Sequence, residues 1–425
     1  MKRSPAQELE RVFGRAQRAH AVMNAPGAKP ALCDLKTTAR SSDNVVKRNA
    51  DIGKANLAMP KGRVVGTEDR HHALDLDTRS LERHQNHGMT LVLGGAAISH
   101  AHKDEQLAMG MAEADPRFIG YARGTLTHWW QDAATTPPLR ILRARILQAQ
   151  HDFSPAAADL RAALREAPDA AQALLVLASI DEVTGDLAEA KDACVRFGIL
   201  RPGLAAVACA ASIGSLSGAA EASETALADA IDRYPTADLS ERLWAHTILG
   251  EIAVRREDAA AERYFQQALA LNRRDVYALT VYADYLLDQG RAMEVLRLLQ
   301  GFERVDALYL RLALAAQASG DARFPAYRDD VAARYEAARR QGDTVHLRDA
   351  SRYALEIGHD GLAALEFARQ NWSLHKTPYD ARTLLTAAIA CHDPAAAKPI
   401  VDWVGATGLK DRAVERLVQR LGAAG

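Results

Sequence analysis

Long apolar runs and aromatic residues are scarce in this sequence. Aromatics make up 6% of the 425 residues, and no stretch approaches the roughly 18–20 consecutive apolar residues that a membrane-spanning helix needs. The basic start, Met1–Arg3, is not followed by the apolar segment of a secretory signal. We therefore expect no membrane span and a cytoplasmic protein. A periplasmic location stays open if the N-terminus is misassigned.

Cysteine is also sparse. The four cysteines are scattered and show neither a CxxC pair nor the spacing of a zinc site: Cys33, Cys194, Cys209 and Cys391. Cys194 and Cys209 lie in apolar, helix-like surroundings, so we interpret them as small core residues. Nothing in this pattern requires an oxidising compartment.

An excess of charge of one sign is missing as well. The formal net charge is −1, which argues against a protein that works mainly on nucleic acid. The first 100 residues hold 16 basic and 10 acidic residues and are mildly basic. Such an arm could contact an acidic surface, but a solvated, poorly folded segment is the favoured interpretation.

Catalytic motifs are absent: no GxSxG, no phosphate-binding loop and no GxGxxG occurs. The one cluster of chemically active residues is histidine-rich: His71, His72, His84, His87, His100 and His102. Histidine with nearby carboxylates can bind zinc or nickel, so a metal-linked accessory or hydrolytic protein is the alternative hypothesis. The spacing matches no known metal site. We predict no metal, no cofactor and no enzyme activity.

Two regions divide the chain. Residues 1–102 contain scattered Pro, Gly, Ser and Asn without a sustained 3.6-residue apolar period, which predicts a low-order arm. Residues 103–425 are predicted to be helical, beginning with helices over Glu105–Ala114 and Phe118–Trp130. The paired Trp129 and Trp130 would cover the apolar edge of the first helix of an array.

A period of 34 residues begins at Pro137. Ala144 and Ala178, Asp152 and Asp186, Ala156 and Ala190, and Pro168 and Pro202 are pairs at this spacing. Turn-forming segments divide each period into two helices: Gln150–Asp152, Thr184–Asp186, Asp288–Gly290 and Ser319–Asp321. Gly can end the first helix in a left-handed conformation, and Asp can cap the second. One such pair cannot bury its apolar face alone, so the pairs must stack into an all-α solenoid.

This pattern resembles the tetratricopeptide repeat family. The resemblance covers Pro137–Ala170, Ala171–Leu204, Arg242–Asp275 and Val276–Tyr309, with a partial unit from Asp306. Residues 205–241 fit a divergent pair, and Arg273 replaces the turn proline of one unit. Beyond residue 323 the period fades although helix pairs continue. Segments such as Tyr282–Leu287 and Asn371–Trp372 look most like functionally unassigned bacterial repeat proteins.

The resemblance implies an antiparallel helix-pair superhelix whose first helices line a concave, partner-binding face. The residues expected to project from that face are polar, with both signs of charge: Arg145, Gln148, Gln172, Ser179, Glu182, His246, Tyr277, Thr280, Asp284, Arg311 and Gln317. Such a surface suits an extended or helical peptide. We therefore predict a non-catalytic scaffold for a protein or peptide partner. Self-association through an exposed array end is a further possibility.

Overall fold

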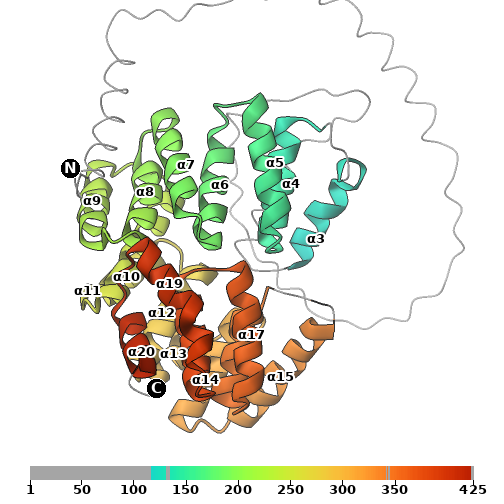
Figure 1. The fold of residues 1–425 in the computed structure, drawn as a ribbon, viewed down its shortest axis with the longest axis vertical. Coiled ribbons are helices and arrows are strands. Elements are labelled where there is room, and N and C mark those ends of the chain that lie inside the picture. The colour runs from blue at the N-terminus through green and yellow to red at the C-terminus, as the bar shows by residue number, and fades with distance from the viewer. Residues whose placement is uncertain (1–115, 131–134, 341, 343–344, 423–425) are drawn as a thin grey trace, which may run out of the picture. The chain divides into compact units, whose positions relative to one another are not determined.

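Helices form all the regular secondary structure in the part of the chain that this computed structural model describes. That part comprises residues 116–130, 135–340, 342 and 345–422 (Figure 1). The predicted arm over residues 1–102 and the helix predicted over Glu105–Ala114 lie outside these ranges. The prediction of an all-α fold is confirmed for the described residues.

The repeat region is a run of antiparallel helices, most of which pack most closely on a neighbour in the chain. It is preceded by α3 (Pro116–Thr125) and the short η2 (Thr127–Trp129), where one helix over Phe118–Trp130 was predicted. The helices that follow, in order, are α4 (Pro137–Ala149), α5 (Phe153–Glu166), α6 (Ala171–Thr184), α7 (Leu187–Leu200), α8 (Leu204–Leu216), α9 (Ala220–Arg233), α10 (Leu239–Arg256), α11 (Ala260–Leu271), α12 (Val276–Asp288), α13 (Ala292–Leu298), α14 (Asp306–Ser319) and α15 (Phe324–Arg340).

Beyond the repeats the helices are less regular in length. They are α16 (Leu347–Arg352), the short π-helix η3 (Tyr353–Ile357), α17 (Gly361–Leu374), α18 (Pro378–Ala390), the short η4 (Pro394–Ala397), α19 (Lys398–Thr407) and α20 (Arg412–Gly422). The fading of the 34-residue period after residue 323 therefore marks a change in packing and not an end of helical structure.

The turns inside the repeats end their first helices as predicted. Gly185, Gly290 and Gly320 have φ angles of +87°, +70° and +67°, a left-handed conformation that glycine adopts without strain. The first repeat places His151 at this position instead, with φ of +57°. A non-glycine residue there is unusual, and its side chain makes a specific contact described below.

The predicted aspartate caps form only in part. Asp152 and Asp186 occupy the N-cap positions of α5 and α7, yet neither side chain accepts a capping hydrogen bond. The Asp186 carboxylate instead accepts from the Thr184 hydroxyl at 3.2 Å. A side-chain cap does occur on α12, where Asp275 accepts from the backbone N–H of Ala278.

Small residues allow the helices of a pair to approach closely. The alanines expected at the helix contacts are at most 1% exposed: Ala144, Ala156, Ala178, Ala190 and Ala283. The closest approach is between α10 and α11, where Gly250 faces the ring of Phe265. A methyl group at Gly250 would come within 3 Å of that ring, at 2.8 Å from Cζ. This helix pair therefore requires glycine.

The tryptophans at the start of the array have the capping role that was predicted. Trp129 and Trp130 pack on a core cluster that α3 and α4 build, with Leu126 and Leu139 among its members. The Arg143 guanidinium holds the segment in place by donating to the carbonyl oxygens of both tryptophans at 2.9 Å. At the other end, Trp372 and Trp403 are buried and their rings meet edge to face at 5.4 Å.

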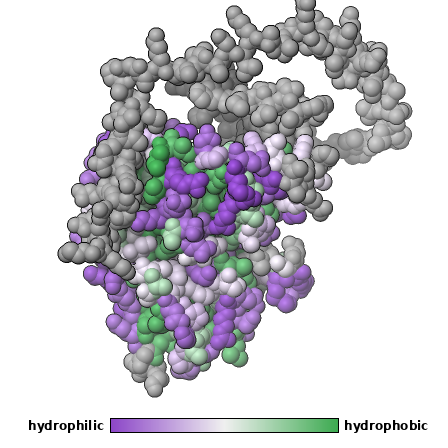
Figure 2. Space-filling model, turned by 45° about the horizontal axis from the view of Figure 1, so that its top comes forward, coloured by the Kyte–Doolittle hydropathy of each residue, from purple (hydrophilic) through white to green (hydrophobic). Residues whose placement is uncertain are grey.

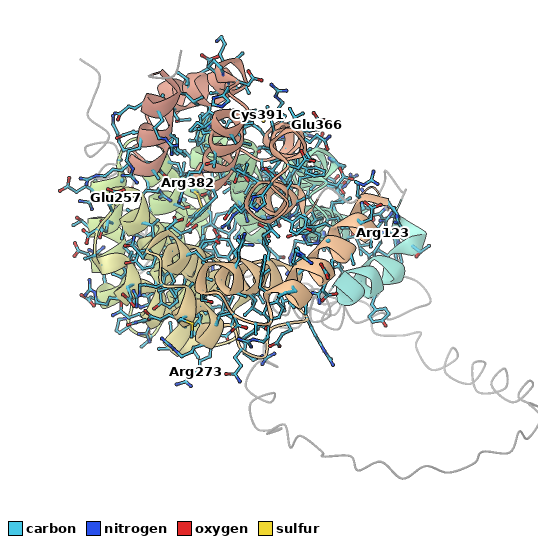
Figure 3. The ribbon with its side chains drawn as sticks, turned by 90° about the horizontal axis from the view of Figure 1, so that it is seen from below. Arg123, Glu257, Arg273, Glu366, Arg382 and Cys391 are labelled. Atoms are coloured by element: carbon cyan, nitrogen blue, oxygen red, sulfur yellow. A yellow bond between two sulfur atoms is a disulfide. The ribbon has the colours of Figure 1, made fainter. Side chains whose placement is uncertain are left out.

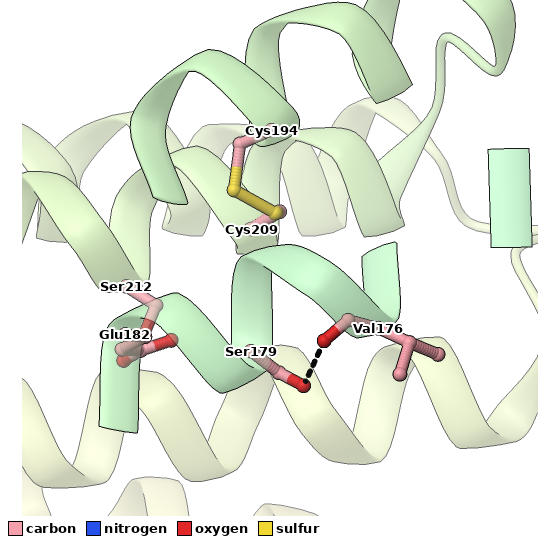
Figure 4. The surroundings of a disulfide bond; sticks show 6 residues. All are labelled: Val176, Ser179, Glu182, Cys194, Cys209 and Ser212. Carbon is pink, nitrogen blue, oxygen red and sulfur yellow. Dashed lines mark hydrogen bonds between the residues drawn. A yellow bond between two sulfur atoms is a disulfide. The ribbon is translucent and has the colours of Figure 1, made fainter. Parts of the chain in front are cut away.

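A disulfide joins α7 to α8 through Cys194 and Cys209 (Figure 4). Both residues are buried, as predicted for core positions, but their covalent pairing corrects the interpretation of them as simple apolar residues. The bond closes a loop of 15 residues, for which the chain-entropy model gives about 3 kcal/mol of stabilisation.

The surface carries hydrophilic side chains with small apolar areas between them, as one face shows in Figure 2. Large exposed apolar side chains are spread over several elements; among them are Tyr121, Leu239, Tyr277 and Leu362. Within the described residues, no helix is both long and apolar enough to cross a membrane.

Candidate binding cleft

The C-terminal helices turn back into the curve of the repeats, which closes part of the concave side. The segment between α17 and α18 lies on the turns of the first two repeats. The Lys376 backbone N–H donates to the Val183 carbonyl at 2.7 Å, and Lys376 Nζ donates to the Thr184 carbonyl at 2.9 Å. A side chain at Gly185 would meet Lys376 Cδ at 2.9 Å, so glycine permits this contact.

A pair of histidines makes a second contact between the α17–α18 segment and the turns of the first repeats. His375 Nε2 lies 2.9 Å from His151 Nδ1, and both rings also contact Phe153. Burial, followed by the charge of the neighbouring His375, lowers the pKa of His151 to about 3. Burial also lowers the pKa of His375. The pair is therefore neutral near pH 7, which allows one ring to donate to the other.

Contacts further along the chain extend the closure. Arg416 on α20 pairs with Glu257 at the end of α10. Arg382 on α18, labelled in Figure 3, pairs with Asp288 at the end of α12. Figure 1 shows the C-terminal helices beside α10 to α14, in agreement with the packing of α20 on α10.

A cleft of about 250 Å³ remains between these two parts of the chain. Its walls come from α12, α14, α16, η3 and α18, and we call it the α12–α18 cleft. Charged side chains dominate the lining. Four are arginines: Arg311, Arg348, Arg352 and Arg382. Three are carboxylates: Asp284, Asp288 and Glu356.

Arg311 anchors the floor of the cleft and is fully buried. It makes a bidentate pair with Asp284, at 3.0 and 2.7 Å, and donates to Asp349 at 2.6 Å. Arg352 adds a bond to Asp284 at 2.6 Å. Burial alone would raise the pKa of Asp284, but the charges of Arg311 and Arg352 outweigh it and hold that pKa well below its ordinary value. The carboxylate is ionised at every physiological pH.

Arg348 differs from the other arginines of the cleft. Its side chain is 34% exposed, and its closest carboxylate oxygens, on Asp349 and Asp380, lie at 3.8 and 3.9 Å. These distances exceed hydrogen-bond range, so the guanidinium makes no hydrogen bond to the described residues. Charge alone pairs it with these two acids, and it is the one arginine of the lining without a hydrogen-bonded carboxylate among the described residues.

Two glutamates, Glu182 on α6 and Glu251 on α10, have perturbed pKa values. Burial raises the pKa of Glu182 to about 7, although a hydrogen bond from the Ser212 hydroxyl at 2.6 Å opposes the shift (Figure 4). Burial also raises the pKa of Glu251, which accepts from the Tyr277 hydroxyl at 2.8 Å. Glu182 can therefore hold or release a proton near neutral pH, which an ordinary surface glutamate does not.

Residues predicted to line the groove have different environments. Tyr277 and Gln172 are exposed. His246, Thr280 and Arg311 are buried, so a partner would reach them only through neighbouring groups.

The other predicted positions are partly exposed and bonded within the protein. Gln148 donates to Ser179 at 2.7 Å, and Ser179 donates to the Val176 carbonyl at 2.9 Å. Gln317 donates to the Glu356 carbonyl at 3.1 Å. Arg145 is partly exposed on α4. Asp284 and Arg311 meet in the cleft, whereas Gln148 and Ser179 belong to the first two repeats.

No pattern in the sequence predicts a site at Arg348, Arg352 or Tyr379. All three lie beyond residue 323, where the 34-residue period fades and no longer assigns positions to an inner or outer face. One signal was available. Arginines recur at 348 and 352, four residues apart, which places both on one face of a short helix.

Within the described residues, no group of three or more histidine, cysteine or acidic side chains is arranged to hold a metal ion. The histidine-rich segment over residues 71–102 lies outside those residues. The metal-linked hypothesis therefore stays a hypothesis about a part of the chain that the structure does not describe.

Comparisons with known proteins add little to this geometry. No protein-family model matches the chain, and no curated protein sequence matches it. Among solved structures, the crystal structure of yeast Tom70 is similar at 12% sequence identity, covering 76% of this chain and 95% of that one, with a TM-score of 0.26. A superposition of that quality supports no conclusion. The description of this chain as a tetratricopeptide-like helical repeat rests on its own helix pairs.

Proposed function

We propose that this protein is a non-catalytic scaffold that binds a protein or peptide partner on its concave side. The observation that carries the proposal is the α12–α18 cleft, because the C-terminal helices cover other parts of the concave side and leave this polar opening. A short segment of a partner fits such a cleft better than a long peptide lying along the whole superhelix.

The predicted groove residues enter this proposal with different roles. Tyr277 is exposed and can contact a partner directly. Asp284 and Arg311 shape the floor of the cleft. Self-association and kinship with bacterial repeat proteins remain predictions.

Site-specific photo-crosslinking tests the proposal. A photoreactive residue is placed at Thr386, which lines the cleft, and separately at Leu362, which is 78% exposed on α17. We expect one partner to be captured from Thr386 and not from Leu362, as resolved by mass spectrometry of the adducts. Equal capture from both positions, or adducts at neither, would contradict binding in the cleft.

We also propose that the protein resides in an oxidising compartment. The Cys194–Cys209 disulfide supports this location, because such bonds persist in the periplasm and outside the cell but are rare in the reducing cytoplasm. The periplasmic alternative is thus favoured over the cytoplasmic one. Thiol alkylation before cell lysis tests it: Cys194 and Cys209 should resist the reagent until reduced, while the unpaired Cys391 reacts after denaturation. Alkylation of all three without reduction would place the protein in the cytoplasm.

A further inference from the structure

Two side chains that line the α12–α18 cleft have donors without a hydrogen-bonded acceptor among the described residues. The carboxylate of Asp284 accepts from Arg311 and Arg352, and that of Asp288 accepts from Arg382. The Arg348 guanidinium and the Tyr379 hydroxyl, by contrast, make no hydrogen bond to the described residues. Both line the cleft.

The carboxylates closest to Arg348 are engaged elsewhere. Asp349 accepts from Arg311 at 2.6 Å. Asp380 accepts from Asn371 at 2.8 Å and from the Thr377 hydroxyl at 2.5 Å, as part of the capping box of α18. Asp349 Oδ1, which lies 3.8 Å from Arg348 Nε, accepts no hydrogen bond, so Arg348 interacts with these two acids through charge and its planar donor face stays without a hydrogen-bonded acceptor.

The charge of the lining limits the ligand. The four guanidinium groups of the lining face three lining carboxylates, and Asp349 and Asp380 lie against Arg311 and Arg348, so five carboxylates surround four arginines. A guanidinium matches a carboxylate in shape, since two parallel N–H groups meet two oxygens. A single carboxylate adds one negative charge beside these acids, whereas a phosphate near neutral pH adds more and is repelled more strongly.

We propose that Arg348, with Tyr379 beside it in the cleft lining, binds the carboxylate of an aspartate or glutamate side chain on the partner. This inference rests on the proposed function and names the chemistry that the cleft recognises. Arg348 supplies the bidentate donor, and the Tyr379 hydroxyl supplies a further hydrogen bond. The neighbouring Arg311 and Arg352 keep Asp284 ionised and bonded, so that it does not compete for Arg348.

Calorimetric titration of the full chain with a small probe tests the inference without knowledge of the partner. The probes are acetyl-Gly-Glu-Gly-amide, its isosteric glutamine analogue and inorganic phosphate, all at constant ionic strength. We expect saturable binding of the glutamate peptide, at least tenfold weaker binding of the glutamine peptide, and weaker binding of phosphate. Equal affinity for glutamate and glutamine, or tighter binding of phosphate, would overturn the carboxylate assignment.

Variants separate recognition from folding. Arg348→Gln should weaken binding of the glutamate peptide at least tenfold, and a retained cooperative thermal transition would show that the variant folds although it loses the ion pairs with Asp349 and Asp380. Arg348→Lys should retain part of the affinity, and Tyr379→Phe should lose about threefold. Arg328→Gln is the matched control, since Arg328 is exposed on α15 and pairs only with Asp329. Unchanged affinity in Arg348→Gln would refute the role of Arg348.

The two proposals fail in different ways. If no partner is captured from Thr386 but the glutamate peptide binds through Arg348, the carboxylate site stands and the scaffold function falls. If the Thr386 adduct forms equally well in Arg348→Gln and the peptide does not bind, the function stands and this inference falls.

Discussion

At the residue scale, several charged side chains and histidines stabilise the fold, although the repeat pattern predicts them on the surface. Arg311 is fully buried because four hydrogen bonds from its guanidinium reach two carboxylates and a backbone carbonyl within the protein. Removal of one partner from such a buried network leaves an uncompensated charge, which typically costs 3–5 kcal/mol. A residue chosen from sequence as a groove contact therefore holds the floor of the cleft in place.

His151 gives the protein a pH-dependent stability. Its pKa is about 3 in the folded state and near 6.5 when unfolded, so the unfolded state binds the proton more readily. This contribution is fully present above pH 6.5 and is lost as the pH falls towards 3. Between pH 7.5 and pH 5, we expect His151 to account for a loss of about 2 kcal/mol in the free energy of unfolding.

Denaturant unfolding of the full chain at the two pH values measures this loss. His151→Asn should reduce it by about that amount, because asparagine tolerates the positive φ but does not titrate. His359→Asn serves as the control, since His359 also has a positive φ but is exposed. An unchanged pH dependence in His151→Asn would show that the closure does not depend on a neutral imidazole.

At the scale of elements, helix boundaries follow local signals while helix contacts follow side-chain size. The prolines at 168 and 202 come two residues after the ends of α5 and α7, as the sequence predicts. The disulfide between α7 and α8 has no comparable signal, because a spacing of 15 residues matches no motif and depends on how the two helices pack. Likewise, the sequence does not show whether a glycine inside a helix can be replaced by alanine, because that depends on the residues packed against it.

Two glycine substitutions show this dependence. Gly250→Ala should destabilise the protein by about 1–3 kcal/mol, since its methyl group would overlap the Phe265 ring in a tightly packed helix pair. Gly405→Ala is the matched change in α19, where the added methyl group meets nothing within 4 Å. It should leave stability unchanged or raise it by up to about 1 kcal/mol through helix propensity. Thermal unfolding measures both, and a Gly250→Ala midpoint at or above that of the parent would contradict the packing argument.

At the scale of the whole molecule, the 34-residue period predicts the fold class and the helix pairs but not their closure. The units predicted over Pro137–Ala170 and Ala171–Leu204 correspond closely to α4–α5 and α6–α7. The predicted concave positions follow from helical geometry within each unit. They do not reveal that α16 to α20 cover part of that surface and supply most of the arginines of the cleft.

The helix pairs, their turns and the stacking that buries their apolar faces can be predicted from the sequence, because all of these depend on residues within one period or the next. The closure, the disulfide and the cleft depend instead on packing between distant parts of the chain. His151 and His375 are 224 residues apart, and their contact depends on the accumulated rotation of every repeat between them. A small angle at each helix pair adds up along the array, and no local pattern encodes that sum.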